Sequence, residues 1–168
     1  AGFGYLRSYY EYAPPGSEEA ESYVVKGGAE TFFARGLYPV SRKVLLGLEA
    51  YYGGGGEEGR RTQDVGGMVA FRWAPNLDRG ITVRGGYGIV YSDIELVTAE
   101  GQEIDGDLTG MLVSLGFGWT FPVGNRWALE PMLRADIAPL GSFQATEEII
   151  FRNIINTRYS VGVSLVWH

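Results

Sequence analysis

Hydrophobic side chains recur at every second position along most of this chain, the pattern of a β-strand, in which successive side chains point to opposite faces. In residues 126–138, Trp127 and Leu133 share one face, whereas Glu130 and Arg134 share the other. The same alternation appears in six further stretches: 22–34, 43–52, 63–73, 81–92, 110–121 and 156–167. No charged residue falls on the apolar face of any of the seven, so each is predicted to be an amphipathic strand.

The first stretch, residues 2–12, alternates less regularly. Arg7 and Glu11 share a phase with Phe3, and we expect both charged side chains to point inward. With the other seven stretches, this gives about eight strands, the number found in the smallest membrane barrels.

The connections between these strands alternate in length. Short turns are predicted at residues 36–39, 74–78 and 122–125, whereas longer polar segments cover residues 13–21, 53–61, 93–107 and 139–153. The run from Gly53 to Gly56 is expected to be a flexible loop tip. Short turns at one end and long loops at the other are typical of bacterial outer-membrane barrels.

Alternation alone also fits a soluble barrel, so the two faces must be assigned. The mixed face holds mainly glycine, serine and threonine, with isolated charges of both signs near the strand middles. Small residues and balanced charges suit a narrow barrel interior, where buried charges have to pair. The predicted lumen charge network consists of Lys26, Glu30, Glu49, Asp64, Arg72, Arg84, Glu130, Arg134, Asp136 and Arg158.

Aromatic residues are sorted along the predicted strands. The tryptophans lie near the short turns, and a group of tyrosines lies toward the long loops. Two such girdles are expected at the two interfaces of a membrane, whereas a soluble core has no reason to sort them. The girdle residues are Trp73, Trp119, Trp127 and Trp167 at one end, and Tyr10, Tyr12, Tyr23, Tyr52, Tyr91 and Tyr159 at the other.

Composition narrows the function classes. The 168 residues suit a single domain, residues 1–168, and a mean hydropathy of -0.05 hides the alternation of polar and apolar positions. No run of about 18 apolar residues is present, so a transmembrane helix is excluded. A net charge of -6 argues against a nucleic-acid partner, and the absence of cysteine excludes disulfides and thiolate metal sites.

The predicted last strand has a strict alternation that ends on an aromatic residue: Tyr159, Val161, Val163, Leu165 and Trp167. With the overall pattern, this strand resembles the small bacterial outer-membrane barrels of the OmpA transmembrane, OmpX and OmpW type. In that family the aromatic residue is usually the last one, whereas here His168 follows. The fold class is therefore expected to be all-β, a closed antiparallel up-and-down transmembrane barrel of about eight strands.

The resemblance also implies a location and partners. It implies a monomer in the bacterial outer membrane, with the long loops extracellular and the short turns and both termini periplasmic. The implied partners are membrane lipid, lipopolysaccharide and the barrel-assembly machinery, which would read the C-terminal strand.

Catalytic chemistry finds little support in the sequence. Barrel enzymes of the lipid deacylase, palmitoyltransferase, phospholipase and protease kinds resemble one another in relying on a histidine. The single histidine here, His168, lies at the end of a strand, where it is poorly placed as a general base. Glu130 with Asp136, or Glu30 with Glu49, could form acid–base pairs, but arginines alternate with them, so structural ion pairs are expected. No cofactor or metal site is predicted.

Two functions therefore stay open. The first is a non-enzymatic envelope protein with a stabilising or surface-interaction role through long acidic outer loops. The alternative is a narrow channel for ions or small apolar solutes. A lipid-modifying hydrolase is disfavoured because a suitable histidine is missing. The sequence leaves open whether the acidic loops bind divalent cations.

Overall fold

The computed structural model describes residues 2–13, 21–57, 60–76, 80–97, 103–144 and 150–167, which are β-strand apart from short turns. Its strands are β1 (Gly2–Ala13), β2 (Glu21–Pro39), β3 (Val44–Glu57), β4 (Arg60–Asn76), β5 (Ile81–Val97), β6 (Glu103–Trp119), β7 (Phe121–Val123), β8 (Trp127–Gln144) and β9 (Ile150–Trp167). Within these residues, no helix is long and apolar enough to cross a membrane.

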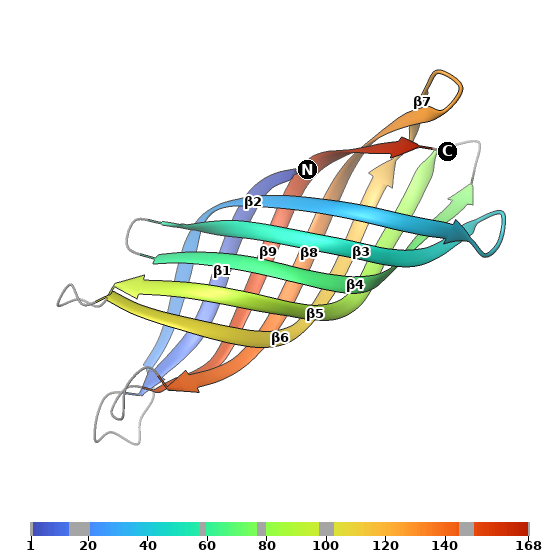
Figure 1. Ribbon diagram of the computed structural model, residues 1–168. Helices are drawn as coiled ribbons and strands as arrows, with labels where there is room; N and C mark the ends of the chain where they lie inside the picture. The colour runs from blue at the N-terminus through green and yellow to red at the C-terminus, as the bar shows by residue number, and fades with distance from the viewer. Residues whose placement is uncertain are drawn as a thin grey trace.

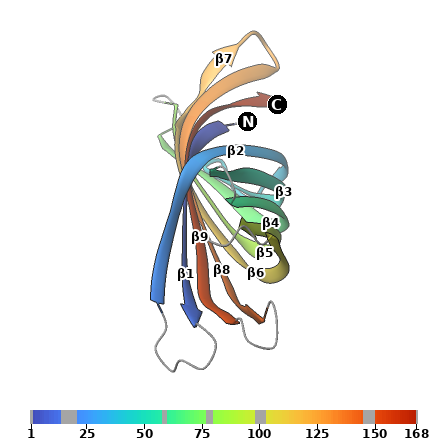
Figure 2. The ribbon, with the colours of Figure 1, turned by 90° about the vertical axis from the view of Figure 1, so that its left-hand side faces the viewer.

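The strands form one strongly curved antiparallel sheet (Figures 1 and 2). Neighbours in the chain pair in succession, and the ring of pairings is completed by β1 with β9 and by β6 with β8. Only Thr120 separates β7 from β6, so the nine segments make eight barrel strands. The prediction of a closed all-β barrel of eight strands is confirmed. Closure lets every strand pair on both sides, which the backbone needs inside lipid.

One seam of the barrel is shorter than the others and is interrupted. The ladder between β6 and β8 has six residue pairs, from Val113–Ile137 to Gly118–Met132, and β7, which continues β6, adds three pairs with β8. Every other ladder between barrel strands has eleven or more. In β8 the short ladder is bounded by Pro131 and Pro139, which lack the N–H that a ladder uses.

The strands extend further than the sequence predicted. Residues 36–39, expected to be a turn, belong to β2, and the chain turns at residues 40–43 instead. There the Ser41 hydroxyl accepts hydrogen bonds from the backbone N–H groups of Lys43 and Val44, at 3.2 and 3.1 Å. Likewise, most of the predicted loop 53–61 is strand, divided between β3 and β4.

The glycine run of residues 53–56 lies within β3, so its prediction as a loop tip is wrong. Close packing explains two of these glycines. A Cβ on Gly53 would overlap the guanidinium of Arg158, and one on Gly55 would lie 2.6 Å from the carbonyl oxygen of Gly28. Glycine in a strand often marks such a close approach, although composition alone suggests a flexible segment.

Along the outside of the barrel runs an apolar band. Its outward-facing residues are apolar or small over stretches of nine residues: 32–40, 44–52, 65–73, 83–91, 111–119 and 159–167, with 127–137 in β8. About 9–11 residues per tilted strand are enough to cross the hydrocarbon of a bilayer. We call this surface the apolar band.

Toward the long-loop end, the strands continue beyond the apolar band. We call the described part of this extension the outer rim: residues 21–31, 53–57, 60–64, 92–97, 103–110, 138–144 and 150–158, with the adjoining end of β1. Here the faces are reversed, because Glu95 and Asp107 point outward whereas Ile94, Leu108 and Leu140 are buried inside. The inward residues form an apolar cluster with Val90, Leu112, Ala138 and Ile154.

Candidate functional site

The interior of the barrel holds a network of buried charges at the level of the apolar band. Within the described residues its charged members are five arginines and four carboxylates, most of them almost fully buried. They are Arg35, Arg72, Arg84, Arg134, Arg158, Glu49, Asp64, Glu130 and Asp136.

Glu130 organises the end of the network nearest the short turns. Its carboxylate is fully buried and pairs with Arg84, while the Nε atom of Arg72 lies 3.4 Å away. Thr82 donates a hydrogen bond of 2.8 Å to it, and Thr120 donates one of 3.1 Å. These contacts offset the desolvation of the carboxylate.

Arg134 lies at the centre of the network. Its Nε atom is 2.8 and 2.9 Å from the two carboxylate oxygens of Asp136, and its Nη1 atom donates a bond of 2.6 Å to Glu49. Glu49 also pairs with Arg35 on the adjacent strand. Because each buried charge has an opposite charge in contact, the cost of desolvation is largely offset.

Asp64 and Arg158, at the inner edge of the outer rim, form the other end of the network. The Nη2 atom of Arg158 is 2.9 Å from Asp64, and the hydroxyl of Ser92 donates a bond of 2.6 Å to the same carboxylate. Arg158 also donates a hydrogen bond to the hydroxyl of Tyr51. The apolar cluster continues from this point into the rim.

Aromatic rings and guanidinium groups alternate through the lumen. The guanidinium groups of Arg35 and Arg134 each lie 5.0 Å from the centroid of the Phe33 ring. The ring of Tyr51 lies 5.3 Å from Arg134 and 5.9 Å from Arg158. Such cation–π contacts are favourable where the charge is desolvated. The interior is therefore filled by side chains, as in other barrels of this size.

Two residues of the predicted network lie elsewhere. Lys26 and Glu30 are exposed on the outside of β2, in the outer rim, so their placement in the lumen was wrong. In β2 the inward residues include Thr31, Phe33 and Arg35. Most of the stretch 22–34 lies in the rim, and only its last residues lie in the band. Because the rim has its apolar face inside, the apolar face of this stretch points inward. The other eight predicted residues lie in the lumen.

The first strand needs a similar correction. Arg7 was expected to point inward, but it is exposed and lies opposite Lys26 in the register of β1 and β2. The side chain of Glu11 lies outside the described residues. A charge on the outer face is possible here because Arg7 belongs to the rim, beyond the hydrocarbon.

Sequence reasoning missed three members of the interior: Phe33, Arg35 and Tyr51. Tyr51 shares the phase of Glu49, two residues earlier, and this signal was available. Arg35 is the direct cross-strand partner of Glu49, which only the register of β2 against β3 shows. From the sequence alone, Arg35 stands next to the predicted turn 36–39, which in the structure belongs to β2.

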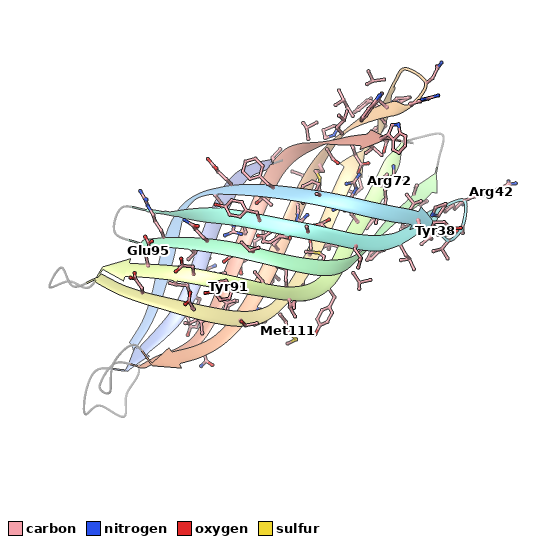
Figure 3. The ribbon with its side chains drawn as sticks, viewed as in Figure 1. Tyr38, Arg42, Arg72, Tyr91, Glu95 and Met111 are labelled. Atoms are coloured by element: carbon pink, nitrogen blue, oxygen red, sulfur yellow. The ribbon has the colours of Figure 1, made fainter. Side chains whose placement is uncertain are left out.

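The aromatic residues lie at the two edges of the apolar band. Trp73, Trp119, Trp127 and Trp167 are exposed at the short-turn edge, and Tyr52, Tyr91 and Tyr159 are exposed at the opposite edge. Figure 3 shows Tyr38 and Arg42 at the short-turn end and Glu95 toward the other end. The side chains of Tyr10, Tyr12 and Tyr23 lie outside the described residues.

Metal and acid–base chemistry have no visible centre in the described part of the chain. Over those residues, no group of three or more histidine, cysteine, aspartate or glutamate side chains could hold a metal ion. His168 lies outside the described residues, as do most of the acidic residues expected in the long loops. The carboxylates of the lumen are held by arginines rather than open to a substrate.

Comparison with solved structures identifies proteins that have a similar architecture. No protein-family model matches the sequence, and no curated protein matches it either. The crystal structure of Neisserial surface protein A, NspA, matches over 99% of this chain and 96% of its own, with a TM-score of 0.52 and 12% identity. The chain has the fold of a small outer-membrane β-barrel. The resemblance inferred from the sequence is thus confirmed at the level of the fold.

Two further outer-membrane barrels show the same likeness at lower scores. OprG from Pseudomonas aeruginosa matches over 100% of this chain and 97% of its own, with 13% identity and a TM-score of 0.45. Ail, the attachment invasion locus protein of Yersinia pestis, matches over 97% of each chain, with 8% identity and a TM-score of 0.43. At such identities, the likeness describes the barrel fold and not the activity.

Proposed function

We propose that this protein is a non-enzymatic integral protein of the bacterial outer membrane, in which the barrel is an anchor and the outer rim and loops form an interaction surface. The observation that carries this proposal is the filled interior. Paired charges occupy the lumen, and the apolar cluster continues from the inside of the band into the rim. A stabilising role in the envelope fits a barrel of this kind.

The proposed orientation has the rim and long loops outside the cell and the short turns in the periplasm. β9 ends at the short-turn end of the barrel, and β1 begins in the middle of the wall, where Gly2 pairs with Thr31, and runs toward the rim (Figure 1). The exposed Arg42 lies at that end, whereas the rim carries Glu95 and Asp105. The barrel-assembly machinery would read β9, and lipid and lipopolysaccharide would surround a monomer. A nucleic-acid partner is disfavoured by the net charge of -6.

A narrow channel remains the second candidate, because several buried donors in the lumen have no partner. Among the described residues, Arg35 Nη1, Arg84 Nε and Arg134 Nη2 have no hydrogen-bond acceptor. Buried donors are almost always satisfied, often by ordered water. A chain of such waters would favour slow ion passage.

Single-channel conductance of the refolded protein in a planar bilayer separates the two functions. A heat-shift gel on the same sample shows whether the barrel is folded. For an anchor we expect a folded, inserted and silent protein. Discrete conductance steps that change with Arg84→Ala or Arg134→Ala would contradict the proposal and favour the channel, with these arginines as its gate.

A further inference from the structure

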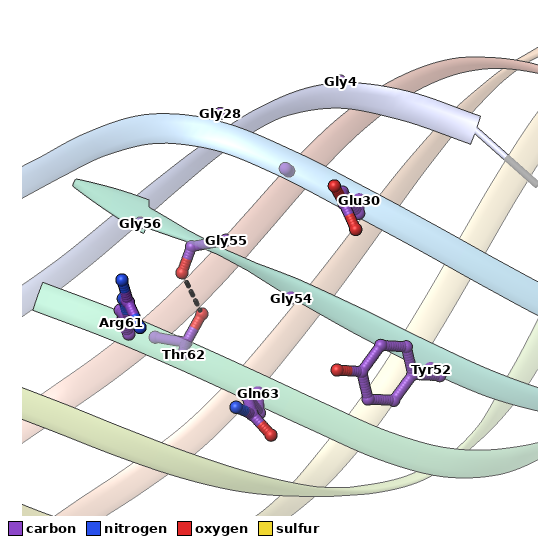
Figure 4. Close-up of a pocket in the computed structure, with 11 residues that line it drawn as sticks. Gly4, Gly28, Glu30, Tyr52, Gly54, Gly55, Gly56, Arg61, Thr62 and Gln63 are labelled. Carbon is purple, nitrogen blue, oxygen red and sulfur yellow. Dashed lines mark hydrogen bonds between the residues drawn. The ribbon is translucent and has the colours of Figure 1, made fainter.

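A trough of about 790 Å³ lies on the outer wall of the barrel where β3 passes between β2 and β4. Its floor is the backbone around Gly28, Gly54 and Gly56, which carry no side chains (Figure 4). Glu30 stands on the β2 side, and Arg61 and Gln63 stand on the β4 side. The register joins them in two rows: Gly28, Gly56 and Arg61, and then Glu30, Gly54 and Gln63.

Packing of the barrel does not require this hollow. A Cβ on Gly28 would meet nothing within 4 Å, and one on Gly54 would meet only the Tyr52 hydroxyl at 3.8 Å and the Thr62 carbonyl oxygen at 3.9 Å. The neighbouring Gly53 and Gly55 differ, because their sites are crowded. Side chains would fit at two floor positions, so their absence leaves space that a ligand can use.

The level of the trough limits what can occupy it. The row of Phe32, Tyr52 and Val65 is the last row of the apolar band, and the trough covers the next two rows on the same outer face. At about 3.3 Å per residue, these rows lie roughly 7–13 Å further along the strands. In a bilayer this is the depth of the headgroups, which flank a hydrocarbon core about 30 Å thick.

Charge makes this side of the rim unlike the other side. Among described outward side chains of β1 to β4, Arg7, Lys26 and Arg61 are basic and only Glu30 is acidic. Arg7 and Lys26 face each other directly in the register, which is unfavourable unless an anion lies between them. On β5 and β6 the corresponding charges are all acidic: Asp93, Glu95, Asp105 and Asp107.

The remaining walls of the trough suit a saccharide. Gln63 and Glu30 offer an amide and a carboxylate to hydroxyl groups, and the Tyr52 hydroxyl leans toward the floor beside Gly54. The rings of Phe32 and Tyr52, 6.2 Å apart, provide apolar surface at the lower edge. Arg61 and Lys26 lie beyond this edge, and arginine and lysine are the usual partners of phosphate.

We propose that the trough binds the phosphorylated saccharide headgroup of an outer-leaflet glycolipid. Arg61 and Lys26 contact its phosphate, and Glu30, Gln63 and Tyr52 contact its hydroxyl groups. The inference rests on the proposed function, because the rim meets such lipids only in the outer leaflet of an outer membrane.

The test uses the full chain in phosphatidylcholine nanodiscs that contain either rough lipopolysaccharide or phosphatidylglycerol. The readout is the amount of added lipid that stays bound after gentle extraction into detergent. Gly54→Phe fills the trough, and Arg61→Gln removes its phosphate contact. The matched controls are Gly36→Phe, an outward glycine of β2 with open space inside the apolar band, and Arg42→Gln, an exposed arginine at the opposite end.

We expect the wild type and both controls to retain lipopolysaccharide. Arg61→Gln should bind it about tenfold more weakly, the loss expected for one charge-assisted contact, and Gly54→Phe should bind it at least as weakly because the trough is filled. Equal retention by all variants would overturn the proposal. Equal retention of phosphatidylglycerol would overturn the saccharide part. A heat-shift gel on every sample separates these results from failure of the barrel to insert, which would refute the proposed function itself.

Discussion

The apolar band and the outer rim are built from the same strands but have opposite polarity. In β5, Ile89 and Tyr91 point outward in the band while Arg84 is buried inside, whereas in the rim Ile94 is buried and Glu95 is exposed. Within β5 and β6 no bulge separates the two parts, because the register between these strands is continuous. The reversal therefore comes from the order of polar and apolar residues along the strand and not from a shift in its pairing. The pleat supplies two faces, and the surrounding solvent decides which face is apolar.

The two regions also differ in what stabilises their interiors. In the band many inward side chains are charges, which are stable only as pairs and networks, although apolar residues such as Met68 and Leu112 are also buried there. In the rim, beyond Asp64 and Arg158, aliphatic residues such as Ile94 are buried, as in a soluble barrel, and burial of their surface is itself favourable. A substitution of the same kind should thus have different effects in the two regions.

The largest effect is expected inside the band. Arg134→Ala removes the partner of Asp136 and one partner of Glu49. We expect it to lower the free energy of unfolding by about 3–5 kcal/mol, the usual effect of leaving a buried charge without its partner. Urea unfolding in detergent micelles measures this free energy. Arg42→Ala, at the exposed end of the barrel, is the control and should change nothing. An unchanged midpoint for the Arg134 variant would refute the network as a source of stability.

A charge introduced on the outer face should impair membrane insertion in the band but not in the rim. Leu133→Arg places a cation in the hydrocarbon at a position 57% exposed, and we expect it to weaken insertion by about 2–4 kcal/mol. Thr109→Arg, on the outer face of the rim, should insert normally. Folding into lipid vesicles, followed by a heat-shift gel, compares the two. Equal insertion of both variants would contradict the assignment of Leu133 to the band and of Thr109 to the rim.

The smallest effect concerns a single methyl group. Ile94→Val trims the apolar cluster of the rim and should cost about 0.5–1.5 kcal/mol, because the cavity is not refilled. Ile89→Val removes the same group from the lipid-facing side of the same strand and should cost much less. Unfolding free energies measured in one detergent test this difference. A larger loss for the Ile89 variant would show that the rim interior is not packed as described.

Much of the band was predictable from the sequence because lipid excludes charge from one face. The phases of Leu133, Val69 and Leu165 follow directly from that rule. The rim was not predictable in the same way, since polar outward residues such as Asp93 and Asp107 look like the start of a loop. The stretch 22–34 crosses from rim to band, and applying a single rule to both gave Lys26 and Glu30 the wrong face.

Other parts of the interior depend on contacts between distant segments. Arg35 belongs to the network because β2 pairs with β3 in a register that places it opposite Glu49. Gly53 is needed in β3 because Arg158, more than a hundred residues later, lies against it. Composition reports neither relation, and so the glycines were expected in a loop.

The short ladder between β6 and β8 gives the barrel a built-in line of weakness. With six pairs, and three more from β7, against eleven or more elsewhere, this seam has the fewest pairs to break when the barrel opens. A barrel opened there becomes a sheet with β6 and β8 at its edges, in which β1 and β9 are still paired. Those amide protons of residues 113–118 that face β8 rather than β5 should therefore exchange with solvent before those that join β1 to β9.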